Sequence, residues 1–379
     1  MAPQTLLQLL QTSTVVDCDT MDFEVAKSLG PFVDCTSNQA IAFFELSKPH
    51  NVNIVKESIE LAKKLAPKYP DVPVQELAVE IAMVKLQLAI STVITGFVHV
   101  QTNPYHSYDT SKMQRVLPLS HNARNIERTD VQGIISLFTH LSPDFPTSRI
   151  CLKIPSSWEG LQTCRILQSE SPPITTLATT LFNMEQAAVA GEVGCHYIAP
   201  YVNELKVHFE PGFVDPNKAH SLCLDAYRYY KKHGIKTQVL PASLTSTDEI
   251  MKLKGVDHIT ISEGLLRQLI EGSAEQWQEK SLFEGEGDGD VGELMKWGDD
   301  EKGWRMAFTR SGNGEGERKL SQGFDWGMFG LGTDCVWDDK SGEDDDGLSW
   351  ERFEAGLKYL QSNARAVQTK PDLYASGVQ

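Results

Sequence analysis

The chain has 379 residues, of which 41% are hydrophobic and 23% are charged, so it can bury a large core in one α/β domain with an appendage or in two domains. Its formal net charge of −16 disfavours nucleic acid as a partner, because a phosphate backbone requires a basic face. We find no run of about 18 apolar residues, so we expect no membrane span.

The seven cysteines are scattered and lie mostly in apolar segments. This usage favours buried, reduced thiols in a cytoplasmic protein over a disulfide framework. The first ten residues lack the cationic start of a secretory signal, and we interpret them as a short amphipathic helix. The spacing of the cysteines and histidines matches no zinc motif, so we expect neither a metal nor another cofactor.

Short β-branched segments alternate with longer amphipathic segments up to about residue 269, which is typical of repeated βα units around a parallel sheet. Eight such units predict an α/β fold, a closed (β/α)8 TIM barrel over residues 1–275. Apolar residues within 52–91 recur at helical spacing, which indicates a helical region that packs against the rest of the fold and is not a site. The predicted strands span residues 14–19, 32–36, 95–101, 150–154, 174–179, 197–200, 237–241 and 258–261.

The composition changes to glycine, acidic residues and tryptophan after the predicted barrel. Residues 275–349 include 20 acidic and eight basic residues, and six of the seven tryptophans follow residue 275. So many aromatic residues predict that parts of an acidic Gly/Trp-rich insertion, residues 276–348, dock as a lid over the barrel mouth or as the interface of a homodimer. Residues 349–379 would form a tail with a final helix, 350–367, that packs on the barrel.

Lys153 lies where the predicted fourth strand leaves the core. A lysine there is costly unless it is paired, solvated or chemically useful. Desolvation lowers the pKa of an amine, and a neutral amine can attack a ketone or aldehyde to form a Schiff base. Lys153 is therefore a candidate nucleophile. The alternative is a strand-end lysine that extends into solvent.

Several other polar residues stand at or near the carboxyl ends of the predicted strands. They are Asp19, Asn38, Gln101 and Thr179. In parallel barrels, polar side chains at these strand ends line the catalytic mouth. The sequence therefore predicts that these side chains converge with Lys153 on one site.

Ordered motifs between about residues 15 and 269 resemble those of the transaldolases. The segment Leu152-Lys-Ile-Pro-Ser-Ser-Trp-Glu-Gly160 resembles the family's lysine strand, (I/L)K(L/I)xSTWEG. Asp19-Thr-Met-Asp22 resembles ADTGD, and Asp34-Cys-Thr-Ser-Asn38 resembles DATTN. The segments Tyr229-Tyr-Lys-Lys-His-Gly-Ile-Lys-Thr237 and Asp257-His-Ile-Thr-Ile-Ser262 also have close counterparts. The resemblance implies a barrel of the class I aldolase type.

The resemblance also implies roles for individual residues. Lys153 would form the imine with a ketose, and Asp19 would be the acid/base group that takes a proton from the hydroxyl beside the reacting bond. Thr179 would help to hold a catalytic water, and Asn38 would hydrogen-bond substrate hydroxyls. We expect the substrate-binding residues to include Thr36, Ala199 and Ser243 as well.

Other positions differ from the transaldolase pattern. Gln101 stands where the family has the glutamate of VSTEVD, and Ala199 and Tyr201 replace the serine and phenylalanine of ISPFVGR. These three residues resemble the related fructose 6-phosphate aldolases, in which glutamine holds the water and tyrosine supplies the acid/base hydroxyl. The resemblance favours aldol addition or cleavage over transfer.

Both arginines that bind the sugar phosphate in transaldolases are replaced, one by Glu204 and the other by Thr245. A carboxylate at this position would repel a phosphate dianion. Lys206 or His208 could compensate, but we interpret each as a solvated or packing residue, because a lysine makes only a point contact. We therefore expect an ordinary phosphorylated sugar to bind poorly.

The main hypothesis is a transaldolase-like class I aldolase that acts through Lys153 on a small ketone or aldehyde without the usual phosphate, in a specialised biosynthetic pathway. One alternative is a pentose-phosphate transaldolase that transfers dihydroxyacetone between sugar phosphates. Another is a non-catalytic barrel that acts as a binding protein, which the altered arginines would favour and the presence of Lys153, Asp19, Asn38 and Thr179 would not.

Overall fold

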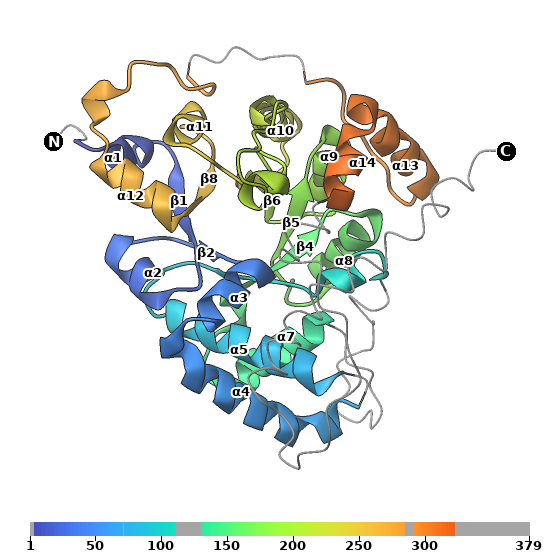
Figure 1. Ribbon diagram of the computed structural model, residues 1–379. Coiled ribbons are helices and arrows are strands. Elements are labelled where there is room, and N and C mark those ends of the chain that lie inside the picture. Colours follow the sequence, from blue (N-terminus) through green and yellow to red (C-terminus); the bar gives the residue numbers. More distant parts are fainter. Residues whose placement is uncertain (1–3, 71, 111–129, 285–290, 323–379) are drawn as a thin grey trace.

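The computed structural model describes residues 4–70, 72–110, 130–284 and 291–322. Strands and helices alternate along most of this chain (Figure 1). The strands are β1 (Val15–Asp19), β2 (Cys35–Thr36), β3 (Val98–Gln101), β4 (Ile150–Pro155), β5 (Thr176–Leu181), β6 (Tyr197–Pro200), β7 (Gln238–Val239) and β8 (His258–Ser262). The helices are α1 (Leu6–Leu10), α2 (Phe23–Leu29), α3 (Gln39–Leu46), α4 (Val52–Leu65), α5 (Val74–Ile90), α7 (Asp130–Leu141), α8 (Trp158–Ser169), α9 (Met184–Glu192), α10 (His220–His233), α11 (Thr247–Lys252), α12 (Glu263–Glu271), α13 (Glu301–Arg310) and α14 (Glu315–Gln322).

The strands form a parallel sheet in the order β7-β6-β5-β4-β3-β2-β1-β8. The hydrogen bond from Thr260 N to Pro241 O, 3.2 Å long, joins β8 to the segment that follows β7 and brings the two edges together. The predicted (β/α)8 TIM barrel is therefore confirmed. β2 and β7 are shorter than predicted, and the expected start of the second strand, Phe32, makes only an isolated bridge with Ile94.

Side chains alternate between two apolar layers, because successive residues of a strand point to opposite faces. One layer lies inside the barrel and consists of Cys151, Leu177, Tyr197, Ala199, Tyr201, Leu240 and Ala242. The other layer fills the space between the strands and the surrounding helices, and includes Leu152 and Ile154 of β4. Cys151 and Lys153 have the same parity on β4, so the lysine faces the interior.

A network of buried polar groups occupies the barrel interior around Asp34, at the start of the β2 segment. Asp34 accepts hydrogen bonds from Phe97 N at 2.7 Å and from the Tyr197 hydroxyl at 3.0 Å, and its Oδ2 lies 2.9 Å from His99 Nε2. Gly96 is required beside it, because a Cβ at that position would lie 2.1 Å from Asp34 Oδ1. Hydrogen bonds of this kind are what make a buried charge tolerable.

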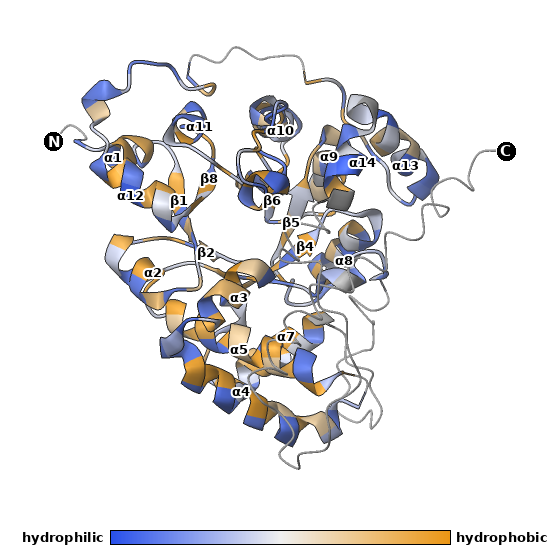
Figure 2. Cartoon of the chain, viewed as in Figure 1, coloured by the Kyte–Doolittle hydropathy of each residue, from blue (hydrophilic) through white to orange (hydrophobic). Residues whose placement is uncertain are grey.

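The predicted helical region 52–91 consists of α4 and α5. Pro67 and Pro73 separate them, because proline cannot donate the hydrogen bond that a helix interior needs. Figure 2 shows that α4 carries hydrophilic residues along its outer side, whereas α5 is hydrophobic along most of its length. α5 contacts α4, α2, α7 and β3, so it is buried on several sides.

Part of the acidic C-terminal segment packs on the barrel helices. Trp304 of α13 is 1% exposed, stacks on Phe308 at 4.9 Å between ring centroids and lies 5.5 Å from the ring of Trp158. Its indole N–H donates to Glu185 O at 3.1 Å. The tryptophan therefore anchors α13 against α8 and α9. The predicted final helix, 350–367, lies outside the described residues.

We expect Asp34→Asn to lower the free energy of unfolding at pH 7 by about 3 kcal/mol, because it removes a charge from a buried hydrogen-bonded network. Burial alone would raise the pKa of Asp34, but the hydrogen bonds from His99, Phe97 and Tyr197 outweigh it and hold this pKa below its usual value. The stabilisation is therefore present above about pH 4 and is lost as pH falls through the folded-state pKa. Urea unfolding at several pH values measures this change.

The control is Asp248→Asn, which changes an exposed carboxylate and should alter the free energy of unfolding by no more than about 0.5 kcal/mol. Equal stability of the two variants at pH 7 would contradict the expectation for Asp34.

Candidate functional site

The carboxyl-terminal half of the barrel brings the predicted site residues to one end of the sheet. Asp19, Thr36 and Gln101 are the last residues of β1, β2 and β3. Lys153 lies within β4 and Thr179 within β5. The remaining residues are Ala199 of β6, Asn38 directly before α3, Tyr201 directly after β6, and Ser243 after β7. All of them belong to strands or loops that meet at the same rim.

Lys153 is buried inside the barrel and is 3% exposed. β4 continues for two residues beyond it, to Pro155, so the lysine is not at the strand end as predicted. Its amine donates a hydrogen bond of 3.3 Å to the carbonyl oxygen of Ser37. The alternative that Lys153 extends into solvent is therefore wrong. The amine is held at the end of the barrel where the other candidate residues gather.

Asp19 is oriented by a chain of hydroxyl groups. The Thr36 hydroxyl donates to Asp19 Oδ1 at 2.7 Å and lies 2.6 Å from the Thr260 hydroxyl, from which it can accept a second hydrogen bond. Thr260 was not among the predicted site residues. Thr260 is the third residue of β8, so its side chain points to the same side as that of His258, into the barrel. This two-residue alternation was the signal available in the sequence.

Gln101 lies beside Lys153, because the two residues are register partners on β3 and β4. The glutamine is 2% exposed, and neither atom of its side-chain amide has a hydrogen-bond partner within the described part of the chain. A buried amide without partners is costly and is rare in folded proteins. The side chain is therefore suited to bind a water molecule or a polar ligand next to the amine.

Thr179 and Tyr201 face one another inside the barrel. Their hydroxyl groups are 3.2 Å apart and hydrogen-bonded. Tyr201 is positioned by a parallel bridge to Ala242, and Ala199 is buried two residues before it. The tyrosine hydroxyl is thus fixed by β5, and its backbone is fixed by the segment that follows β7.

Asn38 has a structural role as well as its predicted one. Its side-chain oxygen accepts a hydrogen bond of 2.9 Å from Ile41 N and caps α3. Asparagine is among the preferred residues at this position because it satisfies a backbone N–H that the helix leaves unpaired. The cap fixes Asn38 between β2 and α3, at the rim.

Ser243 has a backbone φ of +58°, a conformation that costs a non-glycine residue energy and that is often found at functional sites. Asn203 holds this turn, because its side-chain amide donates to Ser243 O at 2.8 Å. The Ser243 hydroxyl lies 2.9 Å from His208 Nε2. His208 follows β6 in a short 3₁₀-helix, Leu205–His208; it is solvent-exposed, and partial desolvation lowers its pKa. It joins the rim through this contact, a role not predicted from the sequence.

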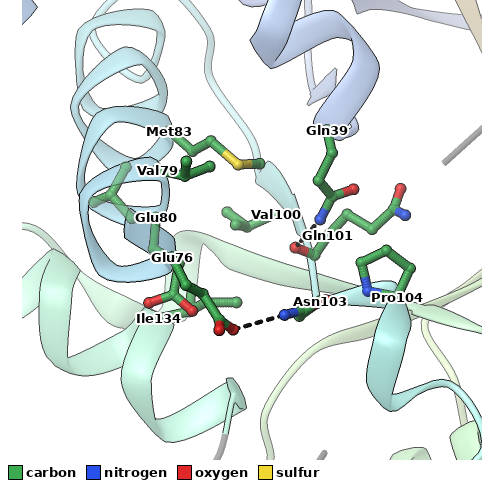
Figure 3. A pocket seen from close by; sticks show the side chains of 11 residues that line it. Gln39, Glu76, Val79, Glu80, Met83, Val100, Gln101, Asn103, Pro104 and Ile134 are labelled. Atoms are coloured by element: carbon green, nitrogen blue, oxygen red, sulfur yellow. Dashed lines mark hydrogen bonds between the residues drawn. The ribbon is translucent and has the colours of Figure 1, made fainter. Parts of the chain in front are cut away.

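A small cavity lies outside the barrel, between α5, β3 and α7 (Figure 3). Gln39 donates to the backbone carbonyls of Gln101 and Thr102 at its edge, and Asn103 donates to Glu76 at 2.6 Å. Figure 3 shows the Gln101 side chain extending away from the α5 residues. The cavity therefore contacts the backbone of Gln101 but is not the mouth of the barrel.

The described residues include one group whose carboxylate and imidazole atoms lie within 4.8 Å of one another, namely Asp17, Asp34 and His258. Asp17 Oδ2 is 2.8 Å from His258 Nδ1, and Asp17 Oδ1 accepts from Asp34 N at 2.9 Å. These atoms hydrogen-bond one another in the barrel interior, where they extend the Asp34 network. The six cysteines in the described part of the chain are buried free thiols.

A buried lysine at the mouth of a closed parallel barrel, with carboxylate, amide and hydroxyl groups at the same rim, is the architecture of a Schiff-base barrel enzyme. The model of the family described as Transaldolase/Fructose-6-phosphate aldolase matches residues 16–303, and the chain belongs to this family. Membership makes it an enzyme of the Schiff-base-forming aldolase and transaldolase class.

Named relatives agree with this assignment. The chain is 31% identical to the transaldolase of Saccharomyces cerevisiae over 281 residues, which cover 71% of this chain and 76% of the relative. It is 31% identical to the transaldolase of Acidobacterium capsulatum over 274 residues, 70% of this chain and 76% of the relative. The match to the transaldolase of Gloeobacter violaceus, at 29% identity, covers 70% of this chain but only 64% of the relative, so this chain spans less than two thirds of that protein.

The family acts on small-molecule sugars, in agreement with the expected ketone or aldehyde substrate. In the residues that the structure describes, no helix has the length and apolar character needed to cross a membrane.

We expect Gln101→Met to leave the free energy of unfolding unchanged or to raise it by about 1 kcal/mol. The substitution replaces an unsatisfied buried amide by an apolar side chain of similar shape, so no hydrogen bond is lost. Thermal and urea unfolding of the purified chain measure the change.

Gln186→Met is the matched control. Gln186 is also buried, but its amide accepts from Phe182 N at 2.7 Å and donates to Ser156 O at 3.0 Å. This substitution should destabilise the protein by about 2 kcal/mol, because it leaves both partners unsatisfied. A similar loss for Gln101→Met would show that its amide is satisfied in the folded protein.

Proposed function

We propose that this protein is a class I aldolase that makes or breaks a carbon–carbon bond through an imine on Lys153, on a non-phosphorylated or otherwise atypical substrate in a specialised biosynthetic pathway. The observation that carries the proposal is the buried Lys153 amine, beside the unsatisfied amide of Gln101 and at the same rim as Asp19. The neutral form of an amine is the one that attacks a carbonyl.

The chemistry begins when Lys153 Nζ adds to the ketone carbon and water leaves, which produces a protonated imine. Asp19 then removes the proton from the hydroxyl beside the reacting bond. The O–H electron pair forms the aldehyde carbonyl, and the electron pair of the broken carbon–carbon bond moves into the imine to give an enamine. Protonation of the enamine carbon and hydrolysis of the imine release the second product and restore the amine. Aldol addition follows the same steps in reverse.

Gln101, Thr179 and Tyr201 support simple cleavage or addition over transfer. The Gln101 amide can hold the water that hydrolyses the imine, and the hydrogen bond from Thr179 positions the Tyr201 hydroxyl to deliver or take up a proton. By resemblance, this glutamine and tyrosine match the fructose 6-phosphate aldolases rather than the transaldolases. Efficient hydrolysis would end each cycle before an acceptor captures the enamine.

The contacts that Glu204 and Thr245 each make with other side chains support an atypical substrate. Glu204 forms an ion pair of 2.9 Å with Arg318, and the Thr245 hydroxyl donates to Glu249 at 2.8 Å. By resemblance, these two positions hold phosphate-binding arginines in transaldolases. Neither residue can donate to a phosphate in the way that an arginine does.

The second candidate function is a transaldolase that moves a dihydroxyacetone unit between sugar phosphates. The names of the relatives from Saccharomyces cerevisiae and Acidobacterium capsulatum favour it. Transfer from fructose 6-phosphate to erythrose 4-phosphate that is faster than reactions with unphosphorylated sugars would select this function. Family membership sets aside the third possibility, a non-catalytic binding protein.

We expect borohydride to trap dihydroxyacetone on wild-type protein and on Lys206→Ala, but not on Lys153→Ala. Lys206 is the control because it is also near the rim, yet its amine is paired with Glu210 at 2.9 Å. Peptide mass spectrometry locates the adduct, and turnover should fall by about a thousandfold or more in Lys153→Ala. Absence of any lysine adduct on wild type with a series of ketones and hydroxyketones would exclude the proposed function.

We expect Asp19→Asn to reduce turnover by about a hundredfold to ten-thousandfold while the borohydride adduct on Lys153 still forms, because the amide cannot accept the proton. Thr36→Ser is the control, since serine retains the hydroxyl that donates to Asp19. Steady-state rates and trapping yields of the three proteins separate imine formation from bond cleavage. Equal rates for Asp19→Asn and wild type would assign the acid/base role to another group.

A further inference from the structure

Helix α14 brings two cations to the carboxyl-terminal rim of the barrel, where α14 contacts β5. Arg318 Nη1 lies 2.9 Å from Glu204 Oε2, and Lys319 Nζ lies 2.9 Å from Asp215 Oδ2. Leu320 is buried beside them at 3% exposure. In Figure 1, α14 lies beside α9, next to the end of the barrel formed by β5 and β6. The match to the family model ends at residue 303, so α14 lies beyond it.

The carboxylates that α14 engages are buried. Glu204 is 4% exposed and follows the site residue Tyr201 by three positions, and its backbone N–H donates to Asp215 Oδ2 at 2.7 Å. Burial opposes ionisation of Asp215, but this hydrogen bond and the Lys319 ion pair outweigh it and hold its pKa below the usual value. A buried carboxylate without a cation would be strongly destabilising, and Arg318 is the cation that the Glu204 carboxylate contacts.

Other cations near this rim also have carboxylate partners. Lys218 lies 2.6 Å from Glu249, which is 3% exposed and also accepts from Asn203 and from Thr245 N. Arg318 has a second carboxylate partner, Glu315, at 2.7 Å, so Glu204, Arg318 and Glu315 together carry one negative charge. Arg318, Lys319 and Lys218, in the part of the rim that the structure describes, are thus each paired with a protein carboxylate.

We propose that α14 sets the substrate class of this enzyme, because the Glu204–Arg318 ion pair closes the rim to phosphate monoesters and leaves it open to neutral, hydroxylated substrates. This inference rests on the proposed aldolase function. A phosphate monoester carries nearly two negative charges at pH 7 and binds best to an unpaired arginine. To offer such a group here, Arg318 would have to leave Glu204 as an uncompensated buried charge.

The rim retains groups that suit a hydroxylated substrate. The Ser243 hydroxyl and the His208 imidazole are hydrogen-bonded at 2.9 Å, and both are neutral when His208 is unprotonated. Such a pair can donate to and accept from a substrate hydroxyl without a charge of its own. The distal end of the substrate would therefore be recognised by hydrogen bonds instead of by an ion pair.

The test compares D-glyceraldehyde with D-glyceraldehyde 3-phosphate as acceptors in dihydroxyacetone addition. Wild type should prefer the unphosphorylated acceptor in kcat/KM. Glu204→Gln should shift this ratio toward the phosphorylated acceptor by roughly tenfold or more, because a repelling charge is removed and Arg318 keeps only its exposed partner Glu315. Calorimetry with inorganic phosphate should show binding to Glu204→Gln at millimolar concentration and none to wild type.

Two variants serve as controls. Glu315→Gln changes the exposed partner of Arg318 and should leave the acceptor ratio as in wild type, whereas Glu204→Gln with Arg318→Gln should abolish the gained phosphate binding. If Glu204→Gln does not fold, the exchange of Glu204→Arg with Arg318→Glu keeps an ion pair and places the cation on the buried side. That variant should also relax the discrimination.

The outcomes separate this inference from the proposed function. Failure to trap any ketone on Lys153 would remove the aldolase function itself. If the adduct forms, but the acceptor ratio and phosphate binding of Glu204→Gln equal those of wild type, the ion pair does not set the substrate class. An equal preference of wild type for both acceptors would overturn the inference in the same way.

Discussion

The site depends on the constraint that eight strands must close into one ring while each strand keeps a two-residue alternation of its side chains. Closure turns every second residue inward. Lys153 therefore shares the interior with Cys151, and Asp19, Gln101 and Thr179 come from separate strands to the same rim. A shift of one residue in any of these strands would move its functional side chain into the layer beneath the helices.

The hydrogen-bonded polar network and the proposed catalytic groups lie in different parts of the barrel interior. Around Asp34 the interior polar groups are hydrogen-bonded to one another, which makes buried charge tolerable. Toward the mouth, not every polar group is satisfied and not every backbone conformation is relaxed. Within the described residues the Gln101 amide is buried without partners, and Ser243 adopts a costly backbone conformation. Unsatisfied or strained groups of this kind are expected where a ligand supplies the missing interactions.

Much of the fold and part of the site could be predicted, because both depend on local patterns. The alternation of strands and helices gave the barrel, and Lys153 was found by its unusual place in an apolar strand. The rest depends on contacts between distant segments. Neither the Ser37 carbonyl that accepts from Lys153, nor the Thr260 hydroxyl near Thr36, nor the ion pair of Glu204 with Arg318 has a signal within its own segment. The observed strand boundaries differ from the predicted ones where strand pairing depends on isolated bridges and on closure of the barrel, and not on local composition.

The helix cap formed by Asn38 decides how this residue can take part in recognition. The cap occupies one of the two lone pairs of its carbonyl oxygen. The NH₂ group of the same amide can therefore donate to a ligand without loss of the cap. An aspartate would cap the helix equally well but would present only acceptors, so the same fold would then lack this donor.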